Sequence, residues 1–475
     1  MRNHTTNPWI VLVLICFAQF MVVLDATVVN VALPSIQKDL NMSEANLQWV
    51  VNAYTLVFGG FLLLGGRVGD LLGRKRFFLA GLVVFTVASL LDGLAQSEGM
   101  LIGSRALQGL GAAFISPAAL AIISTTFKEG AERAKALAVW AAIAIGGSAV
   151  GLVLGGALTQ WLSWPWIFFI NVPVGIAVFF LSLRLVPESR DEHAHRAFDV
   201  AGAVSVTGGL MALVYAIVQA QQKGWGSAQT IITFAVAAIL LVGFVFIELR
   251  AKAPLVRLSI FRVRSLSTAN VVMFLVASGL FAMFFFNSLY IQRVLGYGPL
   301  KAGVAFLPFT AGIMVSAGLA SRFAPRVGVR PVAAIGMVVS VVGMLLLTRL
   351  PVDGSYVADV LPAIVLTSLG MGAVFMPLTL VATTGLKDED QGLASGLFNT
   401  SQQIGGALGL AVLSTVAASR TSAVGGNDAA ALVAGFHWAF AGGAILILAG
   451  LVVMLATLRA RHVARIEAEA APAAA

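Results

Sequence analysis

The sequence predicts an all-α integral membrane protein with fourteen transmembrane helices, built as two six-helix pseudo-repeat bundles plus an inserted pair of linker helices. Composition and hydropathy support this class: the chain is 59% hydrophobic and 11% charged, with a mean hydropathy of +0.94. Soluble domains carry about 25% charged residues. The apolar stretches, about 18–26 residues long, are sufficient to cross a hydrocarbon core of roughly 30 Å. No segment alternates over ten residues as a membrane β-strand would.

Fourteen such stretches follow one another along the chain. Most connections between them are short, as in the turn from Gln96 to Gly99, so consecutive helices are expected to run antiparallel. In order, the predicted helices span approximately residues 9–34, 47–65, 77–96, 100–124, 136–160, 166–186, 200–220, 229–249, 266–291, 300–321, 331–350, 358–384, 392–418 and 431–457.

Basic residues favour one side of the predicted membrane. Because cytoplasmic loops are enriched in lysine and arginine, we expect both termini in the cytoplasm and the protein in the cell (inner) membrane. The same placement explains the formal net charge of +9 without a nucleic-acid partner. The basic residues of the predicted cytoplasmic side include Arg67, Arg74, Lys75, Arg76, Lys128, Arg133, Lys135, Arg190, Arg196, Arg250, Lys252, Arg257, Arg262, Arg264, Arg322, Arg326, Arg330, Arg459, Arg461 and Arg465.

Two polar segments, residues 187–196 and 250–264, divide the chain. They indicate an N-terminal six-helix bundle with its following loop, an inserted helix pair with its loop, and a C-terminal six-helix bundle with a short tail. The predicted boundaries are residues 1–199, 200–264 and 265–475.

The two bundles share a weak repeat. The segment Gly66–Lys75 and its counterpart Ser321–Arg330 place a glycine and basic residues at matched offsets, although Asp70 is replaced by Pro325. Repeated halves around a central site are common in secondary transporters. The repeat therefore favours a transport function.

Asp25 lies inside the first apolar stretch. A carboxylate there costs about 2.5–3.5 kcal/mol on insertion scales, and intramembrane acids mark ion or proton pathways. The functional interpretation is a cavity residue that takes up a proton or a cation. The alternative is a cap on a helix break, because Pro34 follows nine residues later.

Four motifs occur along the chain: Leu24–Pro34, Gly66–Arg76, Arg105–Ala113 and the helix-five glycines followed by Trp164–Pro173. Together they resemble the fourteen-helix drug:proton antiporter family of the major facilitator superfamily, across nearly the whole chain. Where that family usually has Gly-Pro on helix five, this chain has Gly151 and Leu152, and Pro165 replaces a usual arginine. The resemblance implies proton-coupled efflux of bulky amphipathic drugs or antibiotics.

On the predicted fourth helix, five residues fall within one stripe at 3.6 residues per turn. An arginine inside a membrane helix must face protein or water. Arg105 is interpreted as a cation that tunes a nearby carboxylate or relays proton occupancy. The alternative is an arginine that binds helix-end carbonyls as structural glue. The stripe comprises Arg105, Gln108, Gly109, Ala112 and Ser116.

Two features suggest gating. In the loop between the second and third helices, Asp70 and Arg74 are candidates for a latch that closes the cytoplasmic face. On the fifth helix, Gly147, Gly151 and Gly155 recur every four residues, a pattern that allows close helix packing. Those glycines are interpreted either as ordinary packing or as a sliding seam.

The candidate substrate residues are amides and one tyrosine. With many Phe and Met side chains around them, they would suit bulky organic molecules, cationic or neutral; the alternative is hydrogen bonding between helices. Asp92 is expected at the membrane interface. The candidates are Asn30, Gln108, Asn287, Tyr290, Asn399, Gln402 and Gln403.

Enzymatic chemistry is not expected. The chain has no phosphate-binding loop, no nucleophile elbow and no dinucleotide fingerprint. His193 and His195 lie in a polar loop without metal-ligand spacing, and Cys16 is the single cysteine, so no metal, cofactor or disulfide is predicted. The expected partners are a small-molecule substrate, protons and the lipid bilayer, for a monomer. Two alternatives keep the fold: a proton-coupled uptake symporter, and a non-transporting receptor or sensor.

Overall fold

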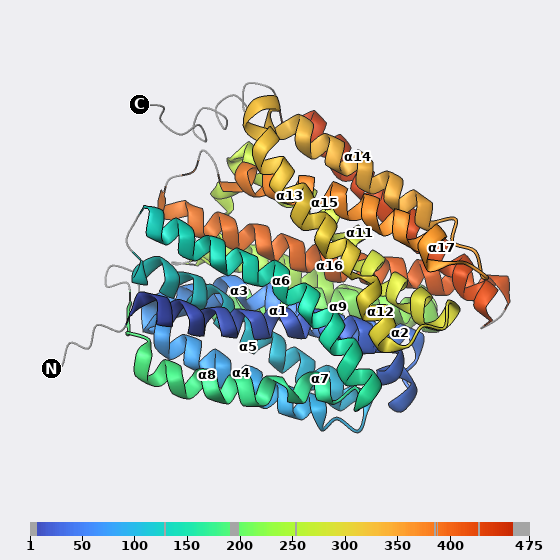
Figure 1. Cartoon of the computed structure of the whole chain (residues 1–475), viewed down its shortest axis with the longest axis horizontal. Helices are drawn as coiled ribbons and strands as arrows, with labels where there is room; N and C mark the ends of the chain where they lie inside the picture. The colour runs from blue at the N-terminus through green and yellow to red at the C-terminus, as the bar shows by residue number, and fades with distance from the viewer. Residues whose placement is uncertain are drawn as a thin grey trace. The chain divides into compact units, whose positions relative to one another are not determined.

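A computed structural model gives the fold of the chain (Figure 1). The structure describes residues 7–127, 130–190, 199–251, 254–383, 386, 388–425 and 428–458. The residues in these ranges contain 14 helices long and apolar enough to cross a membrane, which confirms the predicted fold class.

Several spans are built from more than one helical segment. The predicted sixth helix, for example, breaks at Ile170 into a four-residue turn and a longer helix. The α-helices are α1 (Pro8–Asp39), α2 (Glu44–Leu47), α3 (Trp49–Leu72), α4 (Arg74–Gly93), α5 (Glu98–Thr126), α6 (Ala131–Trp161), α7 (Trp166–Phe169), α8 (Asn171–Leu185), α9 (Val200–Lys223), α10 (Ala228–Arg250), α11 (Arg264–Leu289), α12 (Pro299–Ala305), α13 (Leu307–Val327), α14 (Val329–Leu347), α15 (Leu361–Thr383), α16 (Asp388–Val424) and α17 (Ala429–Thr457). Three shorter segments are η1 (Leu258–Arg262), η2 (Tyr290–Val294) and η3 (Tyr356–Val360).

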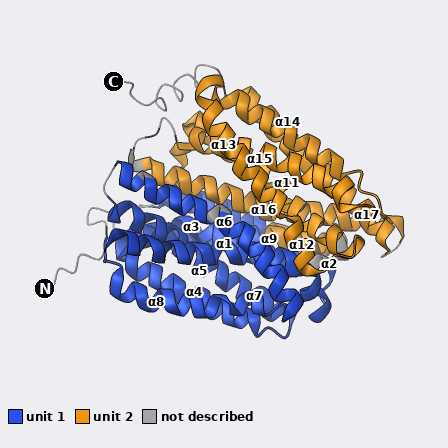
Figure 2. Cartoon of the chain, in the orientation of Figure 1, with its two compact units in different colours: residues 1–211, 237–255 blue, residues 212–236, 256–475 orange. Residues whose placement is uncertain are grey.

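The chain forms two compact units (Figure 2). Unit 1 comprises residues 1–211 and 237–255, and unit 2 comprises residues 212–236 and 256–475. The predicted inserted pair, α9 and α10, is therefore shared between the units, because each of these helices contributes one part to each unit.

The same helix pairing recurs in the two units. In unit 1, α5 packs against α3 and α4, and α1 packs against α6 and α8. In unit 2, α15 packs against α13 and α14, and α11 packs against α16 and α17. The six helices of each unit thus follow one plan, as the weak sequence repeat indicated.

The repeat extends to the turn after the second helix of each unit. Gly73 joins α3 to α4 with φ 115°, and Gly328 joins α13 to α14 with φ 98°. Residues with side chains rarely adopt this left-handed region, so glycine is favoured at both positions. These are the glycines at matched offsets in the sequence repeat.

The first helix runs through Pro34 to Asp39 without a break. The alternative interpretation of Asp25 as a cap on a helix break is therefore wrong. Asp25 instead lies in the middle of α1, with no exposed surface.

Candidate functional site

Asp25 lies in a fully hydrogen-bonded polar cluster inside unit 1. Its Oδ2 accepts from Nη1 of Arg105 at 2.5 Å, and the two side chains are 0% and 1% exposed. Its Oδ1 accepts from Nε2 of Gln108 at 2.8 Å and from Nδ2 of Asn171 at 3.0 Å. The carboxylate of α1 is therefore held by α5 and α8.

Arg105 is held on several sides. Its Nε donates to the carbonyl oxygen of Val50 at 3.0 Å, and its Nη1 also donates to Oε1 of Gln108. The guanidinium carbon lies 4.5 Å from the ring centroid of Tyr54 and 5.5 Å from that of Phe168. Cations over aromatic faces gain additional attraction when they are desolvated. The sequence leaves a contact with a backbone carbonyl and a contact with a carboxylate as alternatives for Arg105. The structure shows both.

Ser89 of α4 completes the cluster. Its hydroxyl donates to the carbonyl oxygen of Phe168 at 3.0 Å. It accepts from the amides of Gln108 at 3.1 Å and Asn171 at 3.0 Å. Six helical segments, namely α1, α3, α4, α5, α7 and α8, thus contribute contacts to one network.

This arrangement suits reversible proton binding. A buried ion pair is maintained only while both partners are charged and hydrogen-bonded, and removing one charge leaves the other uncompensated. Protonation of Asp25 would neutralise the carboxylate and weaken its contact with Arg105. The protonation state of one side chain can therefore bias how six helix segments pack.

Asp92 is fully buried, although the sequence gives no sign of this. It lies one residue before the end of α4, so its expected place near the membrane interface stays a prediction. Its Oδ1 lies 2.6 Å from Oγ of Ser104, whereas its Oδ2 has no hydrogen-bond partner among the described residues. Hydropathy places Asp92 at the end of a span, and only the packing of α4 on α5 encloses it.

The glycines of α6 pack against the helix that carries Asp25. A Cβ added at Gly151 would lie 2.2 Å from Oγ1 of Thr27, and one at Gly155 would lie 2.3 Å from Cγ2 of Val28. At Gly147 the nearest atom, from Phe20, would be 3.2 Å away. Close packing, one of the two sequence interpretations, is thus observed inside unit 1.

Asp70 and Arg74 form an ion pair across the left-handed turn. Arg74 Nε lies 2.8 Å from Asp70 Oδ1, and the side chains are 16% and 36% exposed. Glu188, which the sequence analysis missed, accepts from the backbone N–H of Lys75 at 3.1 Å. Its carboxylate also lies 3.6 Å from Nε of Arg76. The segment after α8 therefore covers the start of α4.

The two candidate substrate residues of unit 1 lie in different surroundings. Gln108 is fully buried and joins the Asp25 cluster, where its amide holds the carboxylate. Asn30 is half-buried, and its amide donates to the carbonyl oxygens of Ala26 at 3.3 Å and Thr27 at 3.4 Å within its own helix. The structure therefore brings only one of the two to the acid.

The candidate substrate residues of unit 2 lie on α11, η2 and α16. Asn287 is fully buried, and neither amide atom has a hydrogen-bond partner among the described residues. The hydroxyl of Tyr290 donates to the carbonyl oxygen of Pro351 at 2.6 Å. On α16, Gln402 and Gln403 are half-buried and Asn399 is exposed. Among these four candidates, Asn287 is the buried one whose amide nitrogen and oxygen both lack a hydrogen-bond partner among the described residues.

Among the described residues, the buried charged side chains all belong to unit 1, whereas the buried polar residues of unit 2 are neutral. The buried charged residues are Asp25, Asp92, Arg105, Asp199 and Glu248. Unit 2 offers hydroxyls and amides where unit 1 offers ionisable groups.

No group of three or more histidine, cysteine or acidic side chains that could hold a metal occurs among the described residues. His193 and His195, considered in the sequence analysis, lie outside those residues. Cys16 is a buried free thiol on α1.

Asn171, Ser89 and Tyr54 were missed in the sequence. The only available signal was the position of Asn171 in the Trp164–Pro173 motif. Asn171 reaches Asp25 across 146 positions of sequence, and Ser89 is an isolated serine in an apolar stretch. Ser89 belongs to no local pattern that marks a site, and the motif does not distinguish Asn171 from its neighbours.

Comparison with known proteins agrees with the fold. The family description "Major Facilitator Superfamily" matches residues 15–410. The puromycin resistance protein pur8 of Streptomyces alboniger is 44% identical over 418 residues, covering 87% of this chain and 83% of the relative. The cephamycin export protein CmcT of Amycolatopsis lactamdurans is 41% identical over 453 residues, covering 94% and 92%.

Among solved structures, the nucleoside transporter NupG is similar with a TM-score of 0.68. It is 12% identical in sequence, and the match covers 95% of this chain and 100% of that one. At this identity the likeness concerns the fold alone.

Proposed function

Because the chain belongs to the major facilitator superfamily, we propose that it is a proton-coupled exporter of bulky amphipathic organic compounds of the drug or antibiotic class. The relatives named for puromycin resistance and cephamycin export support the export direction and the substrate class. A carrier of this kind needs no enzymatic step.

The buried Asp25–Arg105 pair is the observation that carries the proposal. In the exporter, Asp25 binds and releases the proton, and Arg105 compensates its charge when the proton is absent. One proton moving through roughly 150 mV supplies about 3.5 kcal/mol. That energy supports a substrate gradient of roughly 300-fold.

The neutral polar residues of unit 2 are proposed as substrate contacts. Asn287 is a buried amide without a hydrogen-bond partner among the described residues, and it follows Phe285 and Phe286 on α11, so this helix offers hydrogen-bonding groups together with aromatic rings. Such a combination is typical of pockets for organic ligands. Asn30, Gln108, Tyr290, Asn399, Gln402 and Gln403 remain further candidates.

The proposed setting is a monomer in the cell (inner) membrane with both termini in the cytoplasm. Residues 1–199, 200–264 and 265–475 remain the proposed domains. Gly147, Gly151 and Gly155 are proposed as the surface on which α6 shifts against α1 when Asp25 changes charge.

Transport into inverted membrane vesicles tests the function. In these vesicles export appears as uptake of substrate, driven by an inward-acid proton gradient. We expect accumulation of puromycin or a related amphipathic compound that collapses on addition of an uncoupler. Accumulation only in right-side-out vesicles would indicate the symporter, and binding without flux would indicate the receptor.

The Asp70–Arg74 pair provides a prediction about gating. If this pair helps to close the cytoplasmic face, Asp70→Asn should favour the inward-open state and slow export without removing the substrate site. If the pair stabilises the closed state by about 1.4 kcal/mol, its loss raises the ratio of inward-open to closed molecules about tenfold. The measurement is cytoplasmic labelling of Ala26→Cys in a Cys16→Ser background, together with equilibrium binding of a transported compound.

Arg76→Gln, a change in the same turn, serves as the matched control because Arg76 is exposed and only weakly paired. Unchanged labelling in Asp70→Asn, with export lost through weaker binding, would show that Asp70 acts on the substrate site or the fold.

A further inference from the structure

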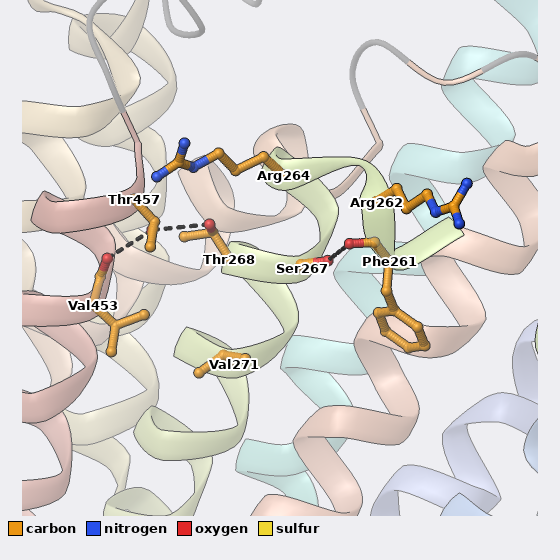
Figure 3. Close-up of a pocket in the computed structure, with 8 residues that line it drawn as sticks. All are labelled: Phe261, Arg262, Arg264, Ser267, Thr268, Val271, Val453 and Thr457. Carbon is orange, nitrogen blue, oxygen red and sulfur yellow. Dashed lines mark hydrogen bonds between the residues drawn. The ribbon is translucent and has the colours of Figure 1, made fainter. Parts of the chain in front are cut away.

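An open pocket of about 350 Å³ lies in unit 2 where α11 begins and α17 ends (Figure 3). It is outside the Asp25 cluster and none of the candidate substrate residues lines it. The lining combines two arginines, three hydroxyls and three apolar side chains, without an acidic residue. These residues are Phe261, Arg262, Arg264, Ser267, Thr268, Val271, Val453 and Thr457.

The pocket lies at the level of a lipid headgroup. Arg264 is the first residue of one membrane span and Thr457 is the last residue of another, so both mark the same membrane boundary. Val271 lies seven residues further along α11, about 10 Å deeper at 1.5 Å per residue. The pocket therefore has a polar end at the membrane boundary and an apolar end deeper along the helices.

The polar end of the pocket suits an anion. Neither arginine has a hydrogen bond or an ion pair to any described residue, and both are exposed. In Figure 3, Arg264 extends over the linked hydroxyls of Thr268 and Thr457, whose oxygens are 2.9 Å apart, and Arg262 lies beside Phe261. Free guanidinium groups favour phosphate oxygens, to which they donate two hydrogen bonds at once.

The deeper end suits an acyl chain. Phe261 is 41% exposed and Val271 is 47% exposed. On the neighbouring helix, Val452 is 60% exposed, so apolar surface continues along the span. A small free anion would leave this surface unused, whereas a phospholipid would cover it.

We propose that this pocket binds an anionic phospholipid, with its phosphate at Arg264 beside the hydroxyls of Thr268 and Thr457 and one acyl chain over Phe261, Val271 and Val453. Arg262 extends to the other side of the pocket mouth and adds positive charge there. Basic pockets beside membrane helices are known to hold such headgroups. The site is independent of the proposed export function.

Thermal stability of the purified protein, titrated with lipid, tests the site. The probes are phosphatidylglycerol, phosphatidylcholine and inorganic phosphate. We expect phosphatidylglycerol to stabilise the wild type, and the joint change Arg262→Gln and Arg264→Gln to weaken this effect about 30-fold, since each arginine near an anionic membrane contributes roughly a factor of five.

The control is Arg322→Gln with Arg326→Gln, two exposed arginines of unit 2 outside the pocket, which should leave the titration unchanged. Val271→Trp fills the apolar end at constant charge and should also weaken binding. Equal stabilisation of both double variants would overturn the site in favour of general charge attraction. If inorganic phosphate stabilises the protein to the same extent, the pocket binds a free anion and the proposed phospholipid is refuted.

A second inference rests on the proposed proton coupling and concerns Asp92. This carboxyl lies one residue before the end of α4, opposite the end that carries Arg74, and it is fully buried. Ser104, its single hydrogen-bond partner, adjoins Arg105, which interacts electrostatically with both Asp92 and Asp25. Two carboxyls and one guanidinium therefore share a buried region of unit 1.

The hydrogen bonds favour a proton on Asp92 in this structure. The Ser104 hydroxyl has one hydrogen and lies 2.6 Å from Asp92 Oδ1 and 2.8 Å from the carbonyl oxygen of Met100. If the hydroxyl donates to the carbonyl, protonated Asp92 donates to the hydroxyl and both contacts are satisfied. An ionised Asp92 would leave Oδ2 charged, buried and without a donor, which is costly.

We infer that Asp92 is a second proton-carrying residue that exchanges a proton with Asp25. When Asp25 gains the proton, Asp92 has lost it, and ionised Asp92 replaces Asp25 as the counter-charge of Arg105. During this transfer the cluster keeps one proton and zero net charge. Coupling to the gradient then requires one of the two carboxyls to take up a proton from one side of the membrane and the other to release one to the opposite side. Besides Arg105 and Asp25, the charged and titratable residues on the helices packed against Asp92 are Tyr54, Arg67, Asp70, Glu98 and Arg184.

Asp92→Asn tests this exchange. We expect gradient-driven export to fall at least tenfold and to lose its dependence on pH, whereas substrate-for-substrate exchange, which needs no net proton movement, persists. The control is Asp199→Asn, a buried acid whose Oδ1 accepts from the backbone N–H of Gly202 at 2.6 Å, a contact that asparagine can keep.

Wild-type export without any response to a proton gradient would refute the proposed function itself. Coupled export in the wild type that Asp92→Asn leaves unchanged, in rate and in pH profile, would refute only the role of Asp92. Loss of substrate exchange as well would show that Asp92 maintains the fold.

Discussion

Asp25→Asn is expected to reduce proton-driven export to background while the protein still inserts into the membrane. Asparagine has nearly the same volume, but it cannot titrate and cannot balance Arg105. Removing one partner of a buried ion pair costs about 3–5 kcal/mol, so the thermal stability of the purified variant should also fall. The measurements are substrate accumulation in inverted vesicles under a proton gradient and thermal unfolding in detergent.

The joint change Asp25→Asn and Arg105→Gln separates the two effects. It removes both charges, so stability should recover in comparison with Asp25→Asn, whereas export should not. If Asp25→Asn alone exports at the wild-type rate, Asp25 is not the site of proton binding.

The second large effect is expected at Arg105. Arg105→Ala should abolish export, because it leaves Asp25 buried without a counter-charge. Arg105→Lys retains the charge, but one ammonium group cannot reproduce the contacts to Asp25, Gln108 and the carbonyl oxygen of Val50. We expect the lysine variant to export roughly 10- to 100-fold more slowly, the equivalent of one lost charge-assisted hydrogen bond.

The same vesicle assay, normalised to the amount of protein in the membrane, ranks the two variants. Full activity of Arg105→Lys would show that only charge matters at this position. A rank order with alanine above lysine would contradict the ion pair as the coupling element.

Hydropathy predicted the existence and order of the spans, because each must be apolar over the width of a bilayer. It did not predict where the helices end. The first helix continues five residues beyond Pro34 through a polar segment to Asp39, and hydropathy does not register such a tail. It also could not register the break at Ile170, where the helical segments on both sides are equally apolar.

The site was predictable where one residue alone violates its surroundings. A carboxylate or a guanidinium inside an apolar stretch costs free energy, so Asp25 and Arg105 were recognisable. Ser89 and Asn171 are inexpensive to place in a helix, and their role depends on contacts that only the packed structure creates. Asp92 was recognisable as an acid, but its burial depends on how α4 packs on α5.

The confinement of buried charge to one of two similarly built units has a consequence for how such a protein can diversify. A substitution among the amides and aromatic rings of unit 2 breaks no buried ion pair there, so it carries only the cost of repacking neutral side chains. If the Asp25 cluster couples export to protons as proposed, new substrate contacts can therefore accumulate in unit 2 while that cluster in unit 1 stays unchanged. Resistance to an unfamiliar compound would then require few mutations, and we expect these to fall mainly in unit 2.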